Sequence, residues 1–215
     1  MTKPRFFIVG LPKSGTSTID QAFSSAGLQP VHWLHNGIPI GKLMYDGWFD
    51  FDDPLHFFEG VDAITQMDFC SAEPGIPKDS EQKLDLLNYW PNLDLGLIVR
   101  IKQMYPESKF ILNYRSPAET SDSMERWHGL SERMASQSIT GLPIGRGNRP
   151  SELMKFIENH HGALRHLFRD DPNFLELDIT SESAGEQFQE FLGVEVPWWG
   201  VANKNEKTTA RSHAT

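Results

Sequence analysis

The sequence predicts an α/β fold of three layers, in which a mostly parallel central sheet is flanked by helices. Two observations support this. Short apolar runs typical of buried strands alternate with longer segments of helical spacing, which is the pattern of a parallel sheet. The 215 residues are also enough to bury a full hydrophobic core, so we expect a single domain over residues 1–215.

The expected elements of the first half alternate between strand and helix, at residues 6–10, 17–26, 29–33, 37–46 and 61–67. Gly27 is a natural carboxyl cap for the first helix. Helical spacing over residues 81–105 breaks near Pro91. The rest is a strand, a helix, a long loop, a helix, a strand and a helix, at residues 109–115, 116–127, 130–150, 151–169, 174–179 and 183–192. Pro117 suits a first helical turn, and Gly193 ends the last helix.

The loop after the first strand has the composition of a phosphate cradle. Backbone N–H groups of residues 14–17 can converge on an anion, next to the positive end of the following helix, and Lys13 adds a full charge. A nucleotide triphosphatase has GxxxxGK followed by Ser or Thr. Here Gly10 and Gly15 keep the spacing, but Thr16 stands at the lysine position and the lysine lies inside the loop.

PKSGTS at residues 12–17 resembles the 5′-phosphosulfate loop of sulfotransferases that use 3′-phosphoadenosine 5′-phosphosulfate (PAPS). A second motif strengthens the resemblance. In that family an arginine at a strand end and a serine eight positions later bind the 3′-phosphate, and Arg115 and Ser123 have this spacing. The strand FLELDI, a helix and FLGV followed by Pro near the end of the chain also resemble small bacterial-type members.

The resemblance implies a P-loop-type fold and transfer of a sulfuryl group from PAPS to a hydroxyl or amine, leaving adenosine 3′,5′-bisphosphate (PAP). It implies no metal. The residues it assigns to the cofactor are Lys13, Ser14, Gly15, Thr16, Ser17, Arg115 and Ser123. Lys13 is also expected to neutralise the leaving oxygen.

This chain departs from the cytosolic members of the family in two places. Thr18 stands where they have a tryptophan that stacks on adenine, and the late Arg-Lys-Gly motif is missing. Candidates for the third phosphate contact are in the polar tail, at Asn203, Lys204, Lys207 and Arg211.

The acceptor must lose a proton, and three residues compete for the role of base. Aligning VDAITQMDF with the family's catalytic strand puts Asp68 at the position of the base. A buried carboxylate with a raised pKa can accept a proton. Histidine needs no large shift near neutrality, which makes His32 the second candidate and His35 the third.

Composition restricts the partners. A formal charge of −9 argues against nucleic acid, anionic membranes and polyanionic glycans, so we expect a small-molecule acceptor. Residues 45–59 mix aromatic and acidic side chains. They predict either a solvated acidic loop or a pocket wall for a cationic or amphipathic molecule, with Trp127, His128 and residues 130–150 opposite. No signal peptide or membrane span is visible, and Cys70 is the sole cysteine, so we expect a cytoplasmic protein with an inert thiol.

Two other functions remain open. A nucleotide or metabolite kinase would use Asp178, at the end of FLELD, for magnesium, although GKS or GKT is missing. A non-catalytic nucleotide-binding protein of the same fold is the second. The adjacent His160 and His161 lie within a helical pattern among apolar residues and are interpreted as structural.

Overall fold

The computed structural model describes residues 2–70 and 88–202. Within these residues, one sheet contains seven strands in the order β4-β3-β2-β5-β1-β8-β9. Neighbours are parallel across five consecutive strands, which are β2 (Pro30–His32), β5 (Ala63–Gln66), β1 (Phe6–Ile8), β8 (Lys109–Tyr114) and, at the outer edge, β9 (Phe174–Asp178). The predicted α/β class with a mostly parallel sheet is therefore confirmed.

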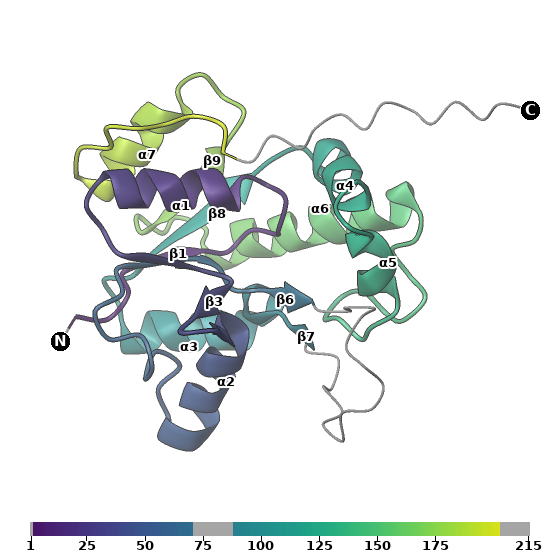
Figure 1. Cartoon of the computed structure of the whole chain (residues 1–215), viewed down its shortest axis with the longest axis horizontal. Helices are drawn as coiled ribbons and strands as arrows, with labels where there is room; N and C mark the ends of the chain where they lie inside the picture. The colour runs from purple at the N-terminus through teal and green to yellow at the C-terminus, as the bar shows by residue number, and fades with distance from the viewer. Residues whose placement is uncertain (1, 71–87, 203–215) are drawn as a thin grey trace, which may run out of the picture.

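Alternation along β1 creates the layers of the molecule, because successive strand residues point to opposite faces of the sheet. Phe6 and Ile8 pack against α1 (Thr16–Ser25) and α7 (Ala184–Leu192). Phe7 and Val9 share a core with the three helices of the other face, which are α2 (Ile40–Phe51), α3 (Leu95–Met104) and α6 (Pro150–Leu167). Figure 1 shows α1 and α7 on one side of the sheet, with α2 and α3 on the other.

A third apolar cluster lies beyond the carboxyl end of β1. Leu11, the residue that opens the loop, is fully buried there against α4 (Pro117–Glu125), α5 (Leu130–Ala135) and the first turns of α6. The cluster also includes Trp90, which precedes the 3₁₀ helix η1 (Pro91–Leu93), and Leu93, its last residue. This packing fixes the start of the phosphate-type loop against helices that follow it by about a hundred residues.

The segment expected to be a helix at residues 37–46 begins instead with a hairpin. β3 (Leu34–His35) and β4 (Ile38–Pro39) are antiparallel and are joined by Asn36 and Gly37, with φ of 52° and 78°. Asn-Gly is the pair that such a tight turn favours. The helix α2 therefore starts only at Ile40 and continues to Phe51.

Two further expectations change in detail. The long loop predicted at residues 130–150 contains α5, and the helical pattern predicted over 81–105 gives a helix only from Leu95, after η1. Residues 81–87 of that pattern lie outside the described part. A short second sheet pairs β6 (Phe69–Cys70) with β7 (Asn88–Tyr89).

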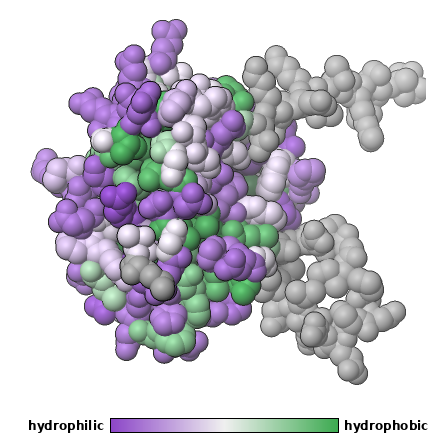
Figure 2. All heavy atoms as spheres, turned by 60° about the vertical axis from the view of Figure 1, so that its left-hand side comes forward, coloured by the Kyte–Doolittle hydropathy of each residue, from purple (hydrophilic) through white to green (hydrophobic). Residues whose placement is uncertain are grey.

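The surface at the amino ends of the strands carries hydrophobic residues in separate patches among hydrophilic ones (Figure 2). In residues 2–70 and 88–202, no helix has the length and apolar character needed to cross a membrane.

Candidate functional site

The loop of residues 10–15 joins β1 to α1 at the carboxyl edge of the sheet. Lys13 and Gly15 have positive φ angles of 67° and 85°. A Cβ at Gly15 would lie 2.6 Å from Ile179 Cδ1, so a side chain there would require the end of the isoleucine side chain to shift, in addition to the positive φ. Gly15 is also the residue that precedes α1, and no side chain caps this end of the helix. The backbone N–H groups at the positive amino end of α1 can therefore bind an anion.

Buried asparagines hold the loop in place. Asn113 Nδ2 donates to the carbonyl oxygen of Ser14 at 2.8 Å and to its Oγ at 2.7 Å, while Asn92 Nδ2 donates to the carbonyl oxygen of Gly10 at 2.9 Å. The Ser14 hydroxyl in turn donates to the carbonyl oxygen of Leu11. Ser14 is buried, so it can contribute to phosphate binding through its N–H rather than its hydroxyl.

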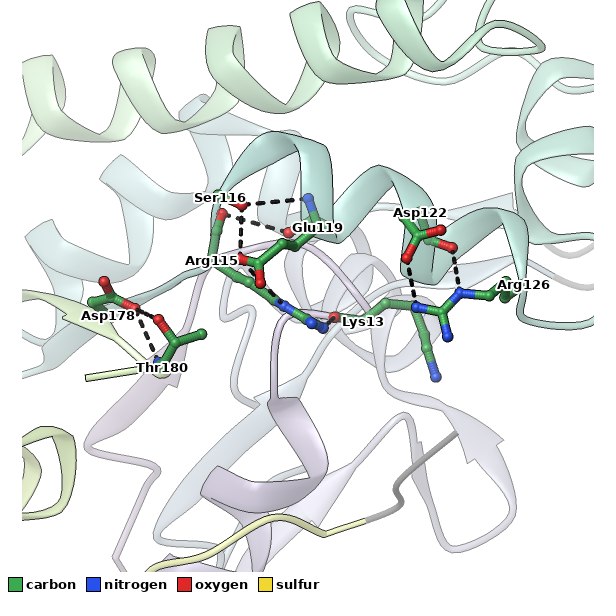
Figure 3. Close-up of polar contacts among 9 residues, drawn as sticks. Lys13, Arg115, Ser116, Glu119, Asp122, Arg126, Asp178 and Thr180 are labelled. Carbon is green, nitrogen blue, oxygen red and sulfur yellow. Dashed lines mark hydrogen bonds and ion pairs between the residues drawn. The ribbon is translucent and has the colours of Figure 1, made fainter. Parts of the chain in front are cut away.

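Three cations gather at the loop. Figure 3 shows Lys13, Arg115 and Arg126 beneath α4. Arg115 Nη1 lies 3.5 Å from the Lys13 carbonyl oxygen, which joins the loop to the end of β8. Burial, then the charges of Arg115 and Arg126, lower the pKa of Lys13 from its ordinary value. Since like charges repel, this arrangement favours a bound anion.

Arg115 has unused hydrogen-bonding capacity, whereas Ser123 is less clearly placed. Nε of Arg115 is buried and has no hydrogen-bond partner, and it lies 3.9 Å from Glu119 Oε2. That carboxylate oxygen already accepts a hydrogen bond from Ser116 Oγ at 2.7 Å. Ser123 is 4% exposed on α4, and no hydrogen bond joins it to Arg115. The structure thus brings together Lys13 and Arg115 but shows no hydrogen bond from the Ser123 side chain to either of them.

A hydrogen-bonded chain links the loop to the predicted base. Thr16 Oγ1 donates to Gln66 Oε1 at 3.1 Å, and Gln66 Nε2 donates to Asp68 Oδ2 at 3.1 Å. Gln66 is the last residue of β5, the strand next to β1. The parallel pairing of β5 with β1 therefore places the Asp68 carboxylate and the start of α1 at the carboxyl edge of the sheet.

Asp68 has the electrostatics of a proton acceptor. Burial raises the pKa of its carboxyl group to about 7, against the opposing effect of the Gln66 hydrogen bond. A base whose pKa lies near the working pH combines a useful deprotonated fraction with real basicity.

His32 belongs to a second chain of polar groups. Its Nδ1 lies 2.9 Å from Thr65 Oγ1, which donates to Asp20 Oδ1 at 2.8 Å. Thr65 Oγ1 also lies 3.0 Å from the Val31 carbonyl oxygen, and the direction of the His32–Thr65 hydrogen bond depends on the tautomer of the imidazole. Burial lowers the pKa of His32, opposed by the charge of Asp20.

The third candidate base, His35, lies elsewhere. Its ring stacks on Phe58 with centroids 5.6 Å apart. Phe58 follows α2 in the segment that packs against the amino terminus, where Lys3 Nζ donates to the carbonyl oxygen of Leu55 at 2.9 Å. Residues 52–59 therefore lie at the opposite edge of the sheet from the loop. Residues 45–51 belong to α2, where Tyr45, Trp48 and Phe49 line a cavity, so the choice between a solvated acidic loop and a pocket wall for residues 45–59 stays a prediction.

Other residues singled out from the sequence have structural contacts. His160 Nε2 bonds the carbonyl oxygen of Val9 at 2.8 Å, and burial lowers the pKa of His160 and His161 to about 4. Burial raises the pKa of Cys70 to about 11, which keeps its thiol protonated. Asp178 Oδ1 accepts hydrogen bonds from the N–H and hydroxyl of Thr180 at 2.9 and 2.7 Å.

The region that the resemblance assigns to adenine is only partly described. Thr18 is 8% exposed, and its Oγ1 accepts a hydrogen bond from Ala202 N at 3.1 Å. The described chain therefore ends beside α1. The tail candidates lie outside the described residues, at Asn203, Lys204, Lys207 and Arg211.

Four contributors to the site were not predicted from the sequence: Gln66, Asn113, Asn92 and Arg126. The first two lie on strands that end at the loop, so a search for polar residues near strand ends would have found them. Arg126 lies eleven positions after Arg115, three helical turns along, which is also a readable spacing.

Models of known protein families and curated protein sequences give no match to this chain. The resemblance to the sulfotransferases therefore rests on the sequence motifs at residues 12–17 and 115–123. Within the described residues, no group of three or more His, Cys, Asp or Glu side chains is placed to hold a metal ion.

Proposed function

We propose that the protein is a sulfotransferase that moves a sulfuryl group from PAPS to a hydroxyl or amine of a small molecule. The observation that carries the proposal is the position of Lys13. It lies inside the loop rather than at its end, where Thr16 stands, and its carbonyl oxygen lies 3.5 Å from Arg115 Nη1. This arrangement suits a ligand with two separate phosphate positions, one at the start of α1 and one at the end of β8.

The fit of the cofactor is supported by groups that lack partners. Arg115 Nε is a buried donor without an acceptor, and α1 begins without a side-chain cap. A phosphate oxygen would satisfy both kinds of donor. PAPS would supply an activated sulfuryl group on a phosphate leaving oxygen.

Each residue then has a separate task. The loop N–H groups and Thr16 bind the 5′-phosphate, and Arg115, together with Ser123 on α4, binds the 3′-phosphate. Lys13 neutralises the charge that grows on the phosphate oxygen as the S–O bond to it breaks. Asp68 takes the proton of the acceptor as the new bond to sulfur forms. The electron pair of the S–O bond that breaks stays on the phosphate oxygen of PAP.

The deciding experiment compares nucleotides before any acceptor is known. Thermal unfolding is measured with PAP, AMP, ADP and ATP, with and without magnesium. We expect PAP at a hundredfold excess over its Kd to stabilise the fold by about 2.7 kcal/mol, and AMP to have a much weaker effect. Release of PAP from PAPS in the presence of EDTA, with a panel of phenols, alcohols and amines, then tests catalysis.

The rival functions give different results. Stabilisation by ATP with magnesium, but not by PAP, would identify a kinase and end the present proposal. Binding of PAP without transfer to any acceptor of the panel would identify a non-catalytic nucleotide-binding protein.

A further inference from the structure

One guanidinium near the site has an unused hydrogen-bonding edge. Arg133, on α5, donates from Nη1 to the carbonyl oxygen of Cys70 at 3.1 Å. Its Nε and Nη2 are enclosed by the protein and have no hydrogen-bond partner among residues 2–70 and 88–202. A buried N–H group without an acceptor costs about 1–3 kcal/mol, so two in one side chain require an explanation.

Nε and Nη2 form the edge with which an arginine binds a carboxylate side-on. Arg165 of this protein does so, with Nε donating to Glu176 Oε2 at 2.7 Å and Nη2 to Oε1 at 2.5 Å. Arg133 takes part in none of the ion pairs among the described residues. The group that matches its free edge is a planar oxyanion with two oxygens.

The position of Arg133 relates it to the acceptor side of the site. The carbonyl that it binds belongs to Cys70, two residues after Asp68. Its guanidinium carbon lies 5.4 Å from the Trp127 ring centre, and Lys13 Nζ lies 4.8 Å from that ring. The Trp127 ring therefore contacts both Lys13 and Arg133.

Arg133 is also not the ionic partner of the predicted base. The pKa of Asp68 is set by burial and by the Gln66 hydrogen bond, with no contribution from an arginine. Among the described residues no ion pair joins Arg133 to Asp68, so the guanidinium can pair with a different carboxylate.

We propose that Arg133 binds a carboxylate of the acceptor, so that the acceptor is a small hydroxy acid whose hydroxyl lies at Asp68. This inference rests on the proposed function. It replaces the cationic or amphipathic acceptor expected from the sequence by an anionic one. Because the free edge has no water-exposed surface, a neighbouring side chain must move to admit the acid.

Three phenols of equal length test the inference: 4-hydroxyphenylacetate, its neutral amide and the cation tyramine. Their Kd values are measured by calorimetry in saturating PAP, and kcat/KM with PAPS. We expect the acid to bind about tenfold or more tightly than the other two, which corresponds to about 1.4 kcal/mol. Arg133→Gln should abolish this preference and leave the Kd of PAP within about twofold.

Arg146→Gln is the matched control, because Arg146 is exposed and already paired with Glu152 at 2.8 Å. It should keep the preference. If Arg133→Gln does not fold, the salt dependence of the wild-type protein decides, since only the acid should bind more weakly as NaCl rises. Equal affinities for acid and amide, or an unchanged preference in a folded Arg133→Gln, overturn the inference. Failure to bind PAP would instead refute the proposed function, and the acid–amide comparison without PAP would still test Arg133.

Discussion

Lys13 and Arg115 lie at one loop, but we expect them to act at different stages. Lys13→Ala should lower kcat at saturating PAPS by about 10²–10³, because the charge it meets grows in the transition state. Arg115→Ala should mainly raise the Kd of PAP, because its contact exists in the ground state. Single-turnover release of PAP and calorimetry separate the two effects. An unchanged kcat in Lys13→Ala would remove it from the chemistry.

The competition between Asp68 and His32 can be settled by isosteric changes. Asp68→Asn should reduce kcat by a factor of about 10²–10⁴, and His32→Gln by less, with PAP binding intact in both. In the wild type, kcat/KM should rise with pH to a plateau above about 7, since the Asp68 carboxyl has a pKa of about 7 and must be ionised. A larger loss in His32→Gln would transfer the role to the histidine.

The residues of the site were predictable to different degrees. Lys13, Thr16 and Arg115 follow strand ends, and adjacent parallel strands bring such residues to one edge. Gln66 could have been found as a polar residue near a strand end, but its contact with Thr16 depends on the pairing of β5 with β1, which spacing along the chain does not specify. The position of His35 also depends on strand pairing, since the hairpin of β3 and β4 turns its ring onto Phe58.

At the scale of elements, the turn into α1 should depend on Gly15 more than its backbone angle alone implies. Gly15→Ala and Gly27→Ala both place a Cβ at positive φ, which costs about 1–2 kcal/mol. At Gly15 the Cβ would also meet Ile179, whereas at Gly27 nothing lies within 4 Å. We expect Gly15→Ala to lose more stability in thermal unfolding and to weaken PAP binding, with Gly27→Ala as control. Equal losses and unchanged binding would contradict the model of a close-fitting loop.

Elements with both a clear period and an end signal agree with the sequence. The helix ending before Gly27, the strand at residues 109–115 and the helix ending at Gly193 are examples. The hairpin of β3 and β4 was missed because its two-residue strands are too short to show alternation, although Asn36 and Gly37 carry the turn signal. α5 was missed because six residues give less than two turns of pattern.

For the whole molecule, burial of Asp68 should make stability depend on pH in an unusual direction. Its folded pKa of about 7 exceeds the ordinary value of 3.8, so its contribution to stability is complete below pH 4 and is lost as pH rises to 7. The loss is up to about 4 kcal/mol. The free energy of unfolding of Asp68→Asn should therefore exceed that of the wild type increasingly between pH 4 and 7. Chemical denaturation checks this, with Asp50→Asn, an exposed site, as control. A difference that stays constant across this range would show that Asp68 is not desolvated.

His160 and His161 work in the opposite direction over the same range. Their folded pKa values of about 4 lie below the ordinary 6.5, so stability is lost as pH falls from 6.5 towards 4. In the wild type the two effects offset each other, and Asp68→Asn should reveal the steeper acid sensitivity of the histidines.

The outer strand β9 bears on how the protein behaves at high concentration. An outer strand offers unpaired backbone groups to a second molecule, and such pairing extends into aggregates. Along β9, Glu176 and Asp178 alternate with apolar residues; Glu176 is held by Arg165, and Asp178 is exposed where the strand turns away. Two copies meeting edge to edge would place these carboxylates close together, which is unfavourable. Asp178, which the sequence suggested as a magnesium ligand, is thus placed to oppose edge-to-edge association of two sheets.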